Sequence, residues 1–478
     1  RDGKLYILQA RPETIHANKA NTSITVEYKL NAPSACLPII TGQAIGQAIV
    51  HGTVRIITNP NHNLSLKPDD IIVTKMTDPD WLPLLKQANG IITDQGGRTC
   101  HAAIVARELG IPAVVGTMQG TRYLTNGQAI TIDCSSGSQA KIYAGHLAYS
   151  KVIQDLTYNG CDQAQIMLNL ADPARAASLS KLPVSGVGLA RLEFIIADRL
   201  KIHPLAISRP TISNQKIQDY IQRQAKPYGS NKDFFIETLA QAIATLAAPF
   251  YPRPVIVRLT DFKSNEYRNL LGGELFEPHE ENPMIGFRGA SRYINSSYQE
   301  AFELECKALK KARETFGLSN IKIMVPFVRT LKEAELTVQV LKTNGLIRGV
   351  NSLELYMMVE IPSNILLLEE FAQYFDGFSI GSNDLTQLTL GIDRDSVIIS
   401  ESFDERDPAV KKFIATAIAT AKRLGKPIGI CGQAPSDFPD FAQWLIGQGI
   451  SSISLNPDSV LSFLQNKLSE KRKPVLSI

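Results

Sequence analysis

The chain has 478 residues, 44% of them hydrophobic, which is enough for two or three domains that each bury a core. Its 50 basic and 46 acidic residues form no block of like charge, which argues against a nucleic-acid partner. No apolar run approaches the roughly 18 to 20 residues of a membrane-spanning helix, and residues 1–14 carry neither a signal-peptide core nor an initiating Met. The six cysteines lie far apart without a CxxC pair. We therefore expect a cytoplasmic protein with reduced thiols, no membrane contact, and an N-terminus that is truncated.

Short β-type runs alternate with turn residues from residue 71 to residue 143 and predict one compact α/β domain. The runs are DDIIVT, GIITD, IPAVVG, AITID and AKIY, and the helical pattern CHAAIVARELG lies among them. Residues 144–160 lack clear periodicity and precede a new strand, so we expect a linker there that acts as a hinge. The small domain is then expected over residues 19–143.

Eight apolar runs separated by helical stretches predict a (β/α)8 barrel over residues 161–478. The runs are QIMLNL, GVGLA, PVIVRL, IKIMVPFV, LELYMMVEI, GFSIGS, PIGICG and SSISL. Residues 206–228 and 265–284 have the character of insertions. The predicted fold class is therefore α/β, with a small domain followed by a C-terminal TIM-type barrel.

Polar side chains follow several of these predicted strands directly. They are Arg191, Glu193, Arg258, Asp261, Glu360, Asn383, Asp384 and Cys431. Enzymes with this architecture build their active sites from residues at the C-terminal ends of the strands. The sequence therefore predicts an active site at this end of the barrel.

A glycine turn precedes the helical pattern and places His101 at or near the start of the helix. Backbone N–H groups and the helix dipole there favour an anion, so they would stabilise a phosphoryl group on the imidazole. The same positive end disfavours the imidazolium and keeps a ring nitrogen free as a nucleophile. Arg98 could add charge-assisted hydrogen bonds to the phosphoryl oxygens. A histidine that merely packs against the turn is the alternative.

Glu360 and Asp384 each come just after a strand and form a natural pair of ligands for Mg²⁺, which prefers hard oxygen donors. Such an ion would supply most of the charge neutralisation that phosphoryl transfer requires. A pair of surface ion-pairing carboxylates is the alternative. For Cys431 the alternative is an ordinary core cysteine.

Three segments resemble motifs of the PEP-utilising enzymes, a family that includes phosphoenolpyruvate synthase, pyruvate phosphate dikinase and enzyme I of the phosphotransferase system. They are GGRTCHAAIVARELGIPAVVG, MMVEIPSN and FSIGSNDLTQLTLGIDRD. The resemblance implies a swivelling domain that carries phosphohistidine at His101. It also implies that Glu360 and Asp384 bind Mg²⁺ and that Gly381, Ser382 and Asn383 form a substrate-contacting loop.

The resemblance further implies how the substrate is held. Arg191 and Arg258 match the arginines that bind the phosphate and carboxylate of phosphoenolpyruvate, a task that suits fixed cationic forks. Cys431 matches the proton donor to the enolate carbon, and a thiol with a reference pKa near 8.5 could both give and take a proton near neutrality. Arg288 and Arg394 are weaker candidates, because each could equally serve in a structural ion pair.

The segments TCH, DFKSNEY and HEENPMIGFRGASRY are most similar to the synthase branch of the family, also called pyruvate, water dikinase. That branch forms phosphoenolpyruvate, AMP and phosphate from ATP, pyruvate and water, in gluconeogenesis. Residues 1–18 resemble the last strand of its ATP-grasp domain, with Gln9 and Arg11 at nucleotide-contacting positions, so we do not expect this chain alone to bind ATP. The resemblance also implies a homodimer and a regulatory kinase that acts on Thr99, where an added anion would repel the phosphoryl group.

Three alternatives stay open at this point. A pyruvate phosphate dikinase would differ in using phosphate instead of water as the second acceptor. An enzyme I-like phosphorelay protein is disfavoured by the ATP-grasp remnant and by the lack of a helical carrier-binding insertion. A non-catalytic sensor or scaffold is disfavoured because His101, Cys431 and both carboxylates are all present.

Overall fold

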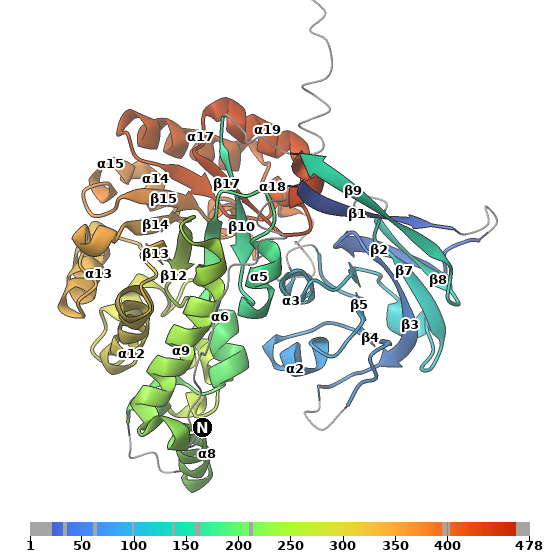
Figure 1. Ribbon diagram of the computed structural model, residues 1–478, viewed down its shortest axis with the longest axis horizontal. Coiled ribbons are helices and arrows are strands. Elements are labelled where there is room, and N and C mark those ends of the chain that lie inside the picture. Colours follow the sequence, from blue (N-terminus) through green and yellow to red (C-terminus); the bar gives the residue numbers. More distant parts are fainter. Residues whose placement is uncertain are drawn as a thin grey trace, which may run out of the picture.

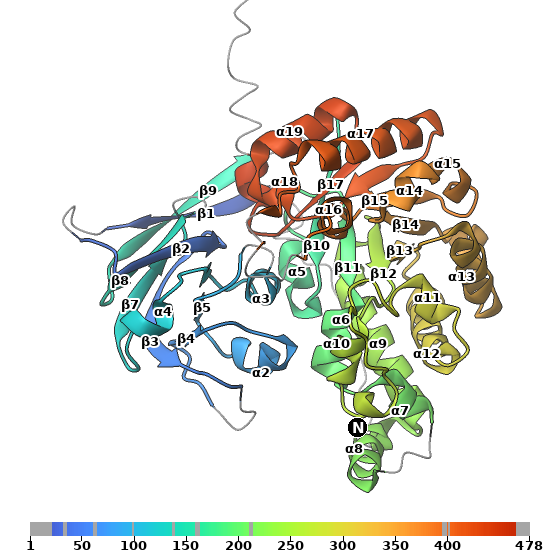
Figure 2. The same ribbon diagram turned by 180° about the vertical axis from the view of Figure 1, so that it is seen from behind.

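The computed structural model describes residues 22–31, 36–60, 65–97, 100–135, 139–157, 163–209, 214–393, 399 and 402–464. These residues form a small barrel and a large barrel that lie side by side (Figures 1 and 2). Within the described ranges, no helix combines the length and the apolar character needed to cross a bilayer. Residues 1–18, with Gln9 and Arg11, lie outside them.

The small barrel has seven strands in the order β2-β6-β5-β4-β3-β7-β8. They are β2 (Ile40–Ile45), β3 (Ile49–Ile56), β4 (Asp70–Thr74), β5 (Gly90–Thr93), β6 (Ala113–Val115), β7 (Ala129–Asp133) and β8 (Gln139–Ala144). The five runs predicted from the sequence correspond to β4–β8, whereas β2 and β3 were not predicted. Strand β4 is buried on both faces, because Ile72 packs in the cluster that contains α3 (His101–Leu109) whereas Ile71 and Val73 pack among β-strand residues. Helices α2 (Leu82–Leu85) and α3 lie on the side that faces the large barrel, and α4 (Gly120–Tyr123) follows β6 (Figures 1 and 2).

The segment expected to be a linker contains a strand. Strand β9 (Tyr149–Thr157) pairs in antiparallel register with β1 (Thr22–Leu30), from Leu30 opposite Tyr149 to Thr22 opposite Thr157. Sequence periodicity did not reveal this strand, because the partner that stabilises β9 lies far away in the sequence. The role of residues 144–160 as a hinge stays a prediction.

The large barrel closes in the order β10 to β17, and each neighbouring pair of strands is parallel. Its strands are β10 (Gln165–Leu170), β11 (Val187–Arg191), β12 (Val255–Arg258), β13 (Ile321–Val325), β14 (Leu355–Val359), β15 (Gly377–Ile380), β16 (Ile428–Ile430) and β17 (Ser452–Leu455). Each of the eight predicted runs coincides with one of them. The predicted TIM-type barrel is confirmed.

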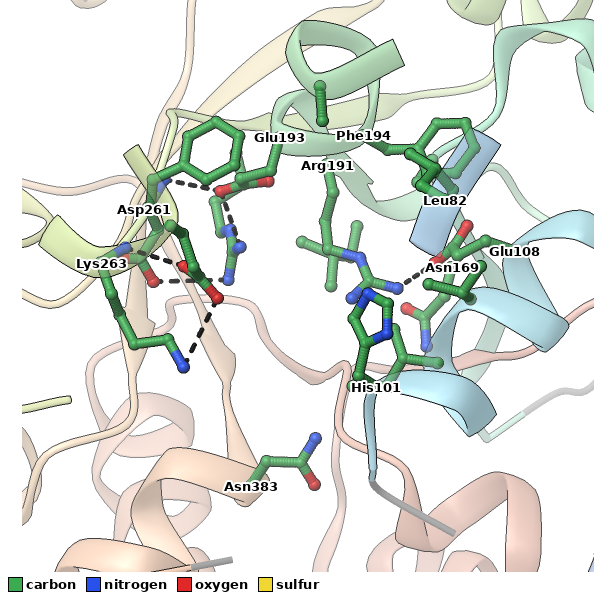
Figure 3. A pocket seen from close by; sticks show the side chains of 18 of the residues that line it. Leu82, His101, Glu108, Asn169, Arg191, Glu193, Phe194, Asp261, Lys263 and Asn383 are labelled. Atoms are coloured by element: carbon green, nitrogen blue, oxygen red, sulfur yellow. Dashed lines mark hydrogen bonds and ion pairs between the residues drawn. The ribbon is translucent and has the colours of Figure 1, made fainter. Parts of the chain in front are cut away.

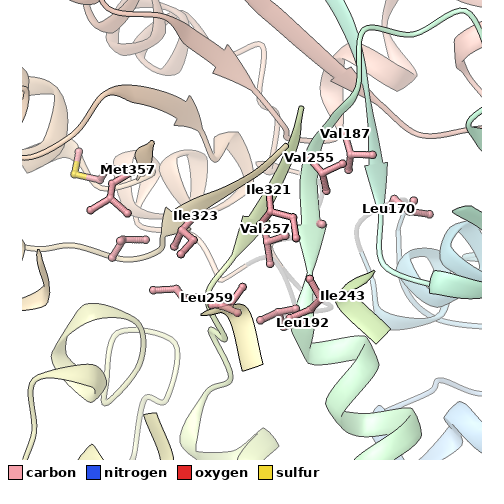
Figure 4. Close-up of a cluster of buried hydrophobic side chains, with 14 of the residues drawn as sticks. Leu170, Val187, Leu192, Ile243, Val255, Val257, Leu259, Ile321, Ile323 and Met357 are labelled. Atoms are coloured by element: carbon pink, nitrogen blue, oxygen red, sulfur yellow. The ribbon is translucent and has the colours of Figure 1, made fainter. Parts of the chain in front are cut away.

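Helices surround these strands (Figure 1). They include α5 (Ala176–Leu179), α6 (Leu192–Ile195), α7 (Pro204–Ser208), α8 (Gln215–Ala225), α9 (Asn231–Ala247), α10 (Ser264–Arg268), α11 (Ala290–Tyr293), α12 (Gln299–Lys310), α13 (Leu331–Thr343), α14 (Pro362–Leu366), α15 (Leu368–Phe371), α16 (Ser382–Leu390), α17 (Pro408–Arg423), α18 (Ala434–Asp437) and α19 (Pro439–Gln448). Successive side chains of β12 point to opposite faces of the strand and so pack in two different cores. Val255 and Val257 pack with Ile243 of α9 in the outer cluster, which Figure 4 shows in close-up, whereas Ile256 belongs to a separate cluster with Cys431.

Shortening Ile243 tests the outer core. Because Ile243 is buried against strands of the large barrel, we expect Ile243→Ala to lower the free energy of unfolding by about 2–5 kcal/mol. The chain has two tryptophans, and Trp444 of α19 belongs to the large barrel. Its fluorescence during urea unfolding, in a Trp81→Phe background, would report this change. The partly exposed Ile347 is the control, because Ile347→Ala should change the free energy by about 0.5 kcal/mol or less.

Candidate active site between the two barrels

A cavity of about 570 Å³ lies at the C-terminal ends of the large-barrel strands and is closed on one side by the small barrel. Its lining includes residues of α3 from the small barrel and residues that follow several of the strands β10–β17. Figure 3 shows His101 and Arg191 on one side and Asp261 and Lys263 on the opposite side. The small and large barrels therefore share one site.

His101 is the first residue of α3, as the sequence predicts. The preceding turn needs glycine at position 96, where φ is 101° and a Cβ atom would lie 2.7 Å from the sulfur of Cys100. The imidazole Nδ1 lies 3.0 Å from the hydroxyl oxygen of Thr77. Burial, together with the ammonium group of Lys263, lowers the pKa of His101 to about 4. The ring is therefore uncharged at neutral pH, with burial as the main cause.

Three buried carboxylates gather on the large barrel. Asp261 follows β12, Glu360 follows β14, and Asp384 lies in the first turn of α16. They offer oxygen atoms that all lie within 4.8 Å of one another. Burial raises the pKa of Glu360 to about 8, and the neighbouring Asp384 and Asp261 add to the shift. The trio could hold a metal ion, and its burial argues against the alternative of surface ion-pairing acids.

Arg288 supplies positive charge to this trio. Its Nε and Nη2 atoms donate to the two oxygens of Asp261 at 3.0 and 2.5 Å, and Nη2 also donates to Asp384 at 2.9 Å. Burial disfavours its charged form, but Asp261 and Asp384 hold the pKa of Arg288 well above its ordinary value. The structure thus brings this weaker candidate into the site, where it is engaged in ion pairs.

The two arginines expected to bind substrate both line the cavity. Arg258 donates to Glu193 at 2.9 Å and lies 3.7 Å from Asp261. Arg191 pairs with Glu108 of α3, so this contact joins the two barrels. An anionic substrate group that reached Arg191 would compete with Glu108.

The three residues of the expected substrate-contacting loop, 381–383, have different surroundings in the structure. A Cβ atom on Gly381 would lie 2.7 Å from Oε2 of Glu360, so glycine permits the carboxylate to approach the backbone. The Asn383 side chain lines the cavity, and its buried Oδ1 has no hydrogen-bond partner among the described residues (Figure 3). The Ser382 side chain instead donates to Glu405 and is not among the cavity-lining residues that the structure describes.

Cys431 lies just after β16 in apolar surroundings. It clusters with Leu189, Ile256, Met324 and Met358, and its Sγ lies 3.6 Å from the carbonyl oxygen of Ile380. Burial raises the pKa of Cys431 to about 11. In this conformation the thiol is therefore protonated at neutral pH and suited to donation, and its expected exchange of protons in both directions stays a prediction.

Some residues of the site were missed by the sequence reasoning. Asp261 was noted after its strand but not as a metal ligand. Asn169 donates to the carbonyl oxygen of Cys431 at 3.3 Å, and its place at the end of QIMLNL could have revealed it. Glu405 carries no comparable sequence signal, because it joins the site only by accepting from Ser382 and from the backbone of Gln433 and Ala434. Arg98, Thr99 and Arg394 lie outside the described residues.

Comparison with protein families gives matches in both parts of the chain. Residues 66–137 match "PEP-utilising enzyme, mobile domain", and residues 146–470 match "PEP-utilising enzyme, PEP-binding domain". The second match alone covers more than half of the chain.

Curated relatives agree with these matches. The chain is 52% identical over 474 residues to a phosphoenolpyruvate synthase of Neisseria meningitidis, covering 98% of this chain and 59% of the relative. It is 53% identical over 465 residues to one of Pseudomonas aeruginosa, covering 96% and 58%, and 49% identical over 459 residues to one of Escherichia coli, covering 96% and 57%. The chain thus spans less than two thirds of the length of these relatives. With a mobile-domain match that contains His101 and a PEP-binding-domain match that contains the buried carboxylates, the chain belongs to the PEP-utilising enzyme family.

Proposed function

We propose that this chain performs the pyruvate half of a phosphoenolpyruvate synthase reaction, in which a phosphoryl group moves between His101 and the enol oxygen of pyruvate. The observation that carries the proposal is that His101, Cys431 and the trio of buried carboxylates line one cavity although they come from two barrels. In the intact enzyme, ATP would phosphorylate His101 at a nucleotide site outside this chain, with water as the second acceptor. The names of the curated relatives favour this branch over a dikinase that uses phosphate or an enzyme I-like relay.

Mg²⁺ fits the carboxylate trio, because all three donors are hard oxygens that lie within 4.8 Å of one another. Glu360 and Asp384 are the proposed ligands, with Asp261 as a third candidate. When bound, the ion would supply positive charge at the enolate oxygen. Arg288 neutralises part of the remaining negative charge.

The chain's own residues account for the other requirements of the transfer. We infer that Nδ1–H of His101 donates to Thr77, which leaves Nε2 with a free lone pair. As phosphoenolpyruvate is consumed, its bond between phosphorus and the enol oxygen breaks while a bond to Nε2 forms. The protonated Cys431 then donates its proton to the enolate carbon. Arg191 and Arg258 orient the anionic groups of the substrate, with Arg191 exchanging Glu108 for substrate.

The homodimer, the cytoplasmic location and the regulatory kinase acting on Thr99 stay predictions. The homodimer and the kinase follow from the family resemblance, and the location follows from the composition of the sequence.

The central test is transfer of label from phosphoenolpyruvate. Incubating the chain with [³²P]phosphoenolpyruvate and Mg²⁺ should give a protein-bound label that is labile in acid and stable in base, as a phosphohistidine is. His101→Ala should abolish it, because no other residue is proposed to carry the phosphoryl group. If correctly folded wild-type protein takes up no label, the chain only binds its ligand and the proposal fails.

Removing the thiol should separate phosphoryl transfer from protonation. We expect Cys431→Ala to slow the exchange of pyruvate methyl protons with solvent by about 100-fold or more, because the group that protonates the enolate carbon must remove a methyl proton in the reverse direction, and a positioned acid or base typically contributes that much. The same variant should still accept label on His101. Cys134→Ala is the matched control, since Cys134 is a buried cysteine of the small barrel. Wild-type exchange in Cys431→Ala would remove this thiol from the reaction.

Thr77 tests the tautomer assignment. Thr77→Val keeps the shape of the side chain but removes the hydroxyl that accepts from Nδ1–H, so labelling of His101 should slow by roughly fivefold for a hydrogen bond worth about 1 kcal/mol. Thr77→Ser restores a hydroxyl and should label at nearly the wild-type rate. Equal rates for the valine and serine variants would contradict the assignment. Quench-flow measurement of the initial labelling rate distinguishes these outcomes.

A further inference from the structure

The last turn of α3 lies against the large barrel. Arg175 lies in the segment after β10. Nη1 of its guanidinium donates to the carbonyl oxygens of Arg107 and Glu108, at 2.9 Å each. Carbonyl groups at the end of a helix lack partners within the helix and carry partial negative charge. Arg175 thus binds, from another barrel, two acceptors at the end of the helix that carries His101, of which the Arg107 carbonyl also accepts from the N–H of Gly110 at 3.2 Å.

Gly110 makes this contact possible. It ends α3 in the left-handed conformation, with φ of 70°, which glycine adopts without strain. A Cβ atom at this position would also lie 2.8 Å from the guanidinium carbon of Arg175. Both the turn and the approach of Arg175 therefore require a residue without a side chain.

An ion pair between the two barrels lies beside the Arg175 contact. The guanidinium of Arg107, on α3, is 3.6 Å from the carboxylate of Asp437 on α18, and only 6% of each side chain is exposed. Asp458, in the segment after β17, is also near enough to interact with Arg107. A charge as deeply buried as that of Arg107 is costly without an opposite charge, and in this arrangement the large barrel provides it.

The charges on the two sides of this contact alternate. The end of α3 presents the Arg107 cation, the helix carbonyls and the Glu108 carboxylate, whereas the large barrel presents Asp437, Arg175 and Arg191 opposite them. Electrostatic complementarity of this kind fixes the register of two surfaces more than it adds to their affinity. The short helix is a rigid spacer, so fixing its last turn also fixes its first residue, His101.

We infer that the last turn of α3 is a docking surface for the rim of the large barrel, with Arg175 and Asp437 as the residues that hold it. Docking at this end of the helix positions His101 at the other end over the substrate cavity. Arg175 is therefore a positioning residue for transfer between the barrels and has no part in chemistry that the large barrel performs alone. The inference rests on the proposed function, since it assigns the docked arrangement to the transfer step.

Two reactions of the same protein test this inference. Labelling of His101 by [³²P]phosphoenolpyruvate requires both barrels, whereas exchange of pyruvate methyl protons with solvent requires only the large barrel and Mg²⁺. We expect Arg175→Ala to slow labelling by about tenfold, the effect of losing charge-assisted hydrogen bonds worth about 1.4 kcal/mol, and to leave the exchange rate unchanged. Arg175→Lys keeps the charge and should recover part of the labelling rate. Lys181→Ala removes an exposed cation from the segment after α5 and should alter neither reaction.

Small-angle X-ray scattering gives an independent measure of docking. We expect Arg175→Ala to have a larger radius of gyration than the wild type, because a released small barrel extends the molecule. Unchanged labelling in Arg175→Ala, or an equal loss of labelling and proton exchange, would overturn the docking role. Absence of label on the wild type would instead overturn the proposed function, and the docking inference with it.

Discussion

The structure depends on holding three carboxylates together at the mouth of an apolar barrel. Asp261, Glu360 and Asp384 are all buried and offer oxygens within 4.8 Å of one another, and burial together with the two neighbouring carboxylates raises the pKa of Glu360. Arg288 offsets this cost by binding two of them. A divalent cation would offset it further, which makes the same arrangement a binding site.

The cavity lining combines charged and apolar groups. The carboxylates and Arg258 supply the charge, whereas Cys431 lies among aliphatic side chains and methionines. The proposed substrate has a similar division, with phosphate and carboxylate groups beside an uncharged methylene. Burial raises the pKa of the thiol on the apolar side, where the proposed reaction delivers a proton to carbon.

The small barrel contributes His101 to a cavity that is otherwise lined mainly by the large barrel. In this arrangement burial lowers the pKa of His101, and the ammonium group of Lys263 on the large barrel adds to the shift. The two ends of α3 have separate tasks in this picture. Its first residue faces the cavity, and its last turn contacts Arg175 and Arg191 on the large barrel.

The sequence by itself determined features that depend on local pattern. Strands β10–β17 are short apolar runs because parallel strands are buried on both faces, and polar residues such as Glu360 mark their C-terminal ends. The start of α3 at His101 follows from the glycine turn. Only the tertiary structure decided the carboxylate distances, the pairing of β1 with β9, the Arg191–Glu108 contact and the role of Glu405. These features join residues far apart in the chain, and the pKa shifts of His101 and Cys431 arise from burial that exists only in the folded protein.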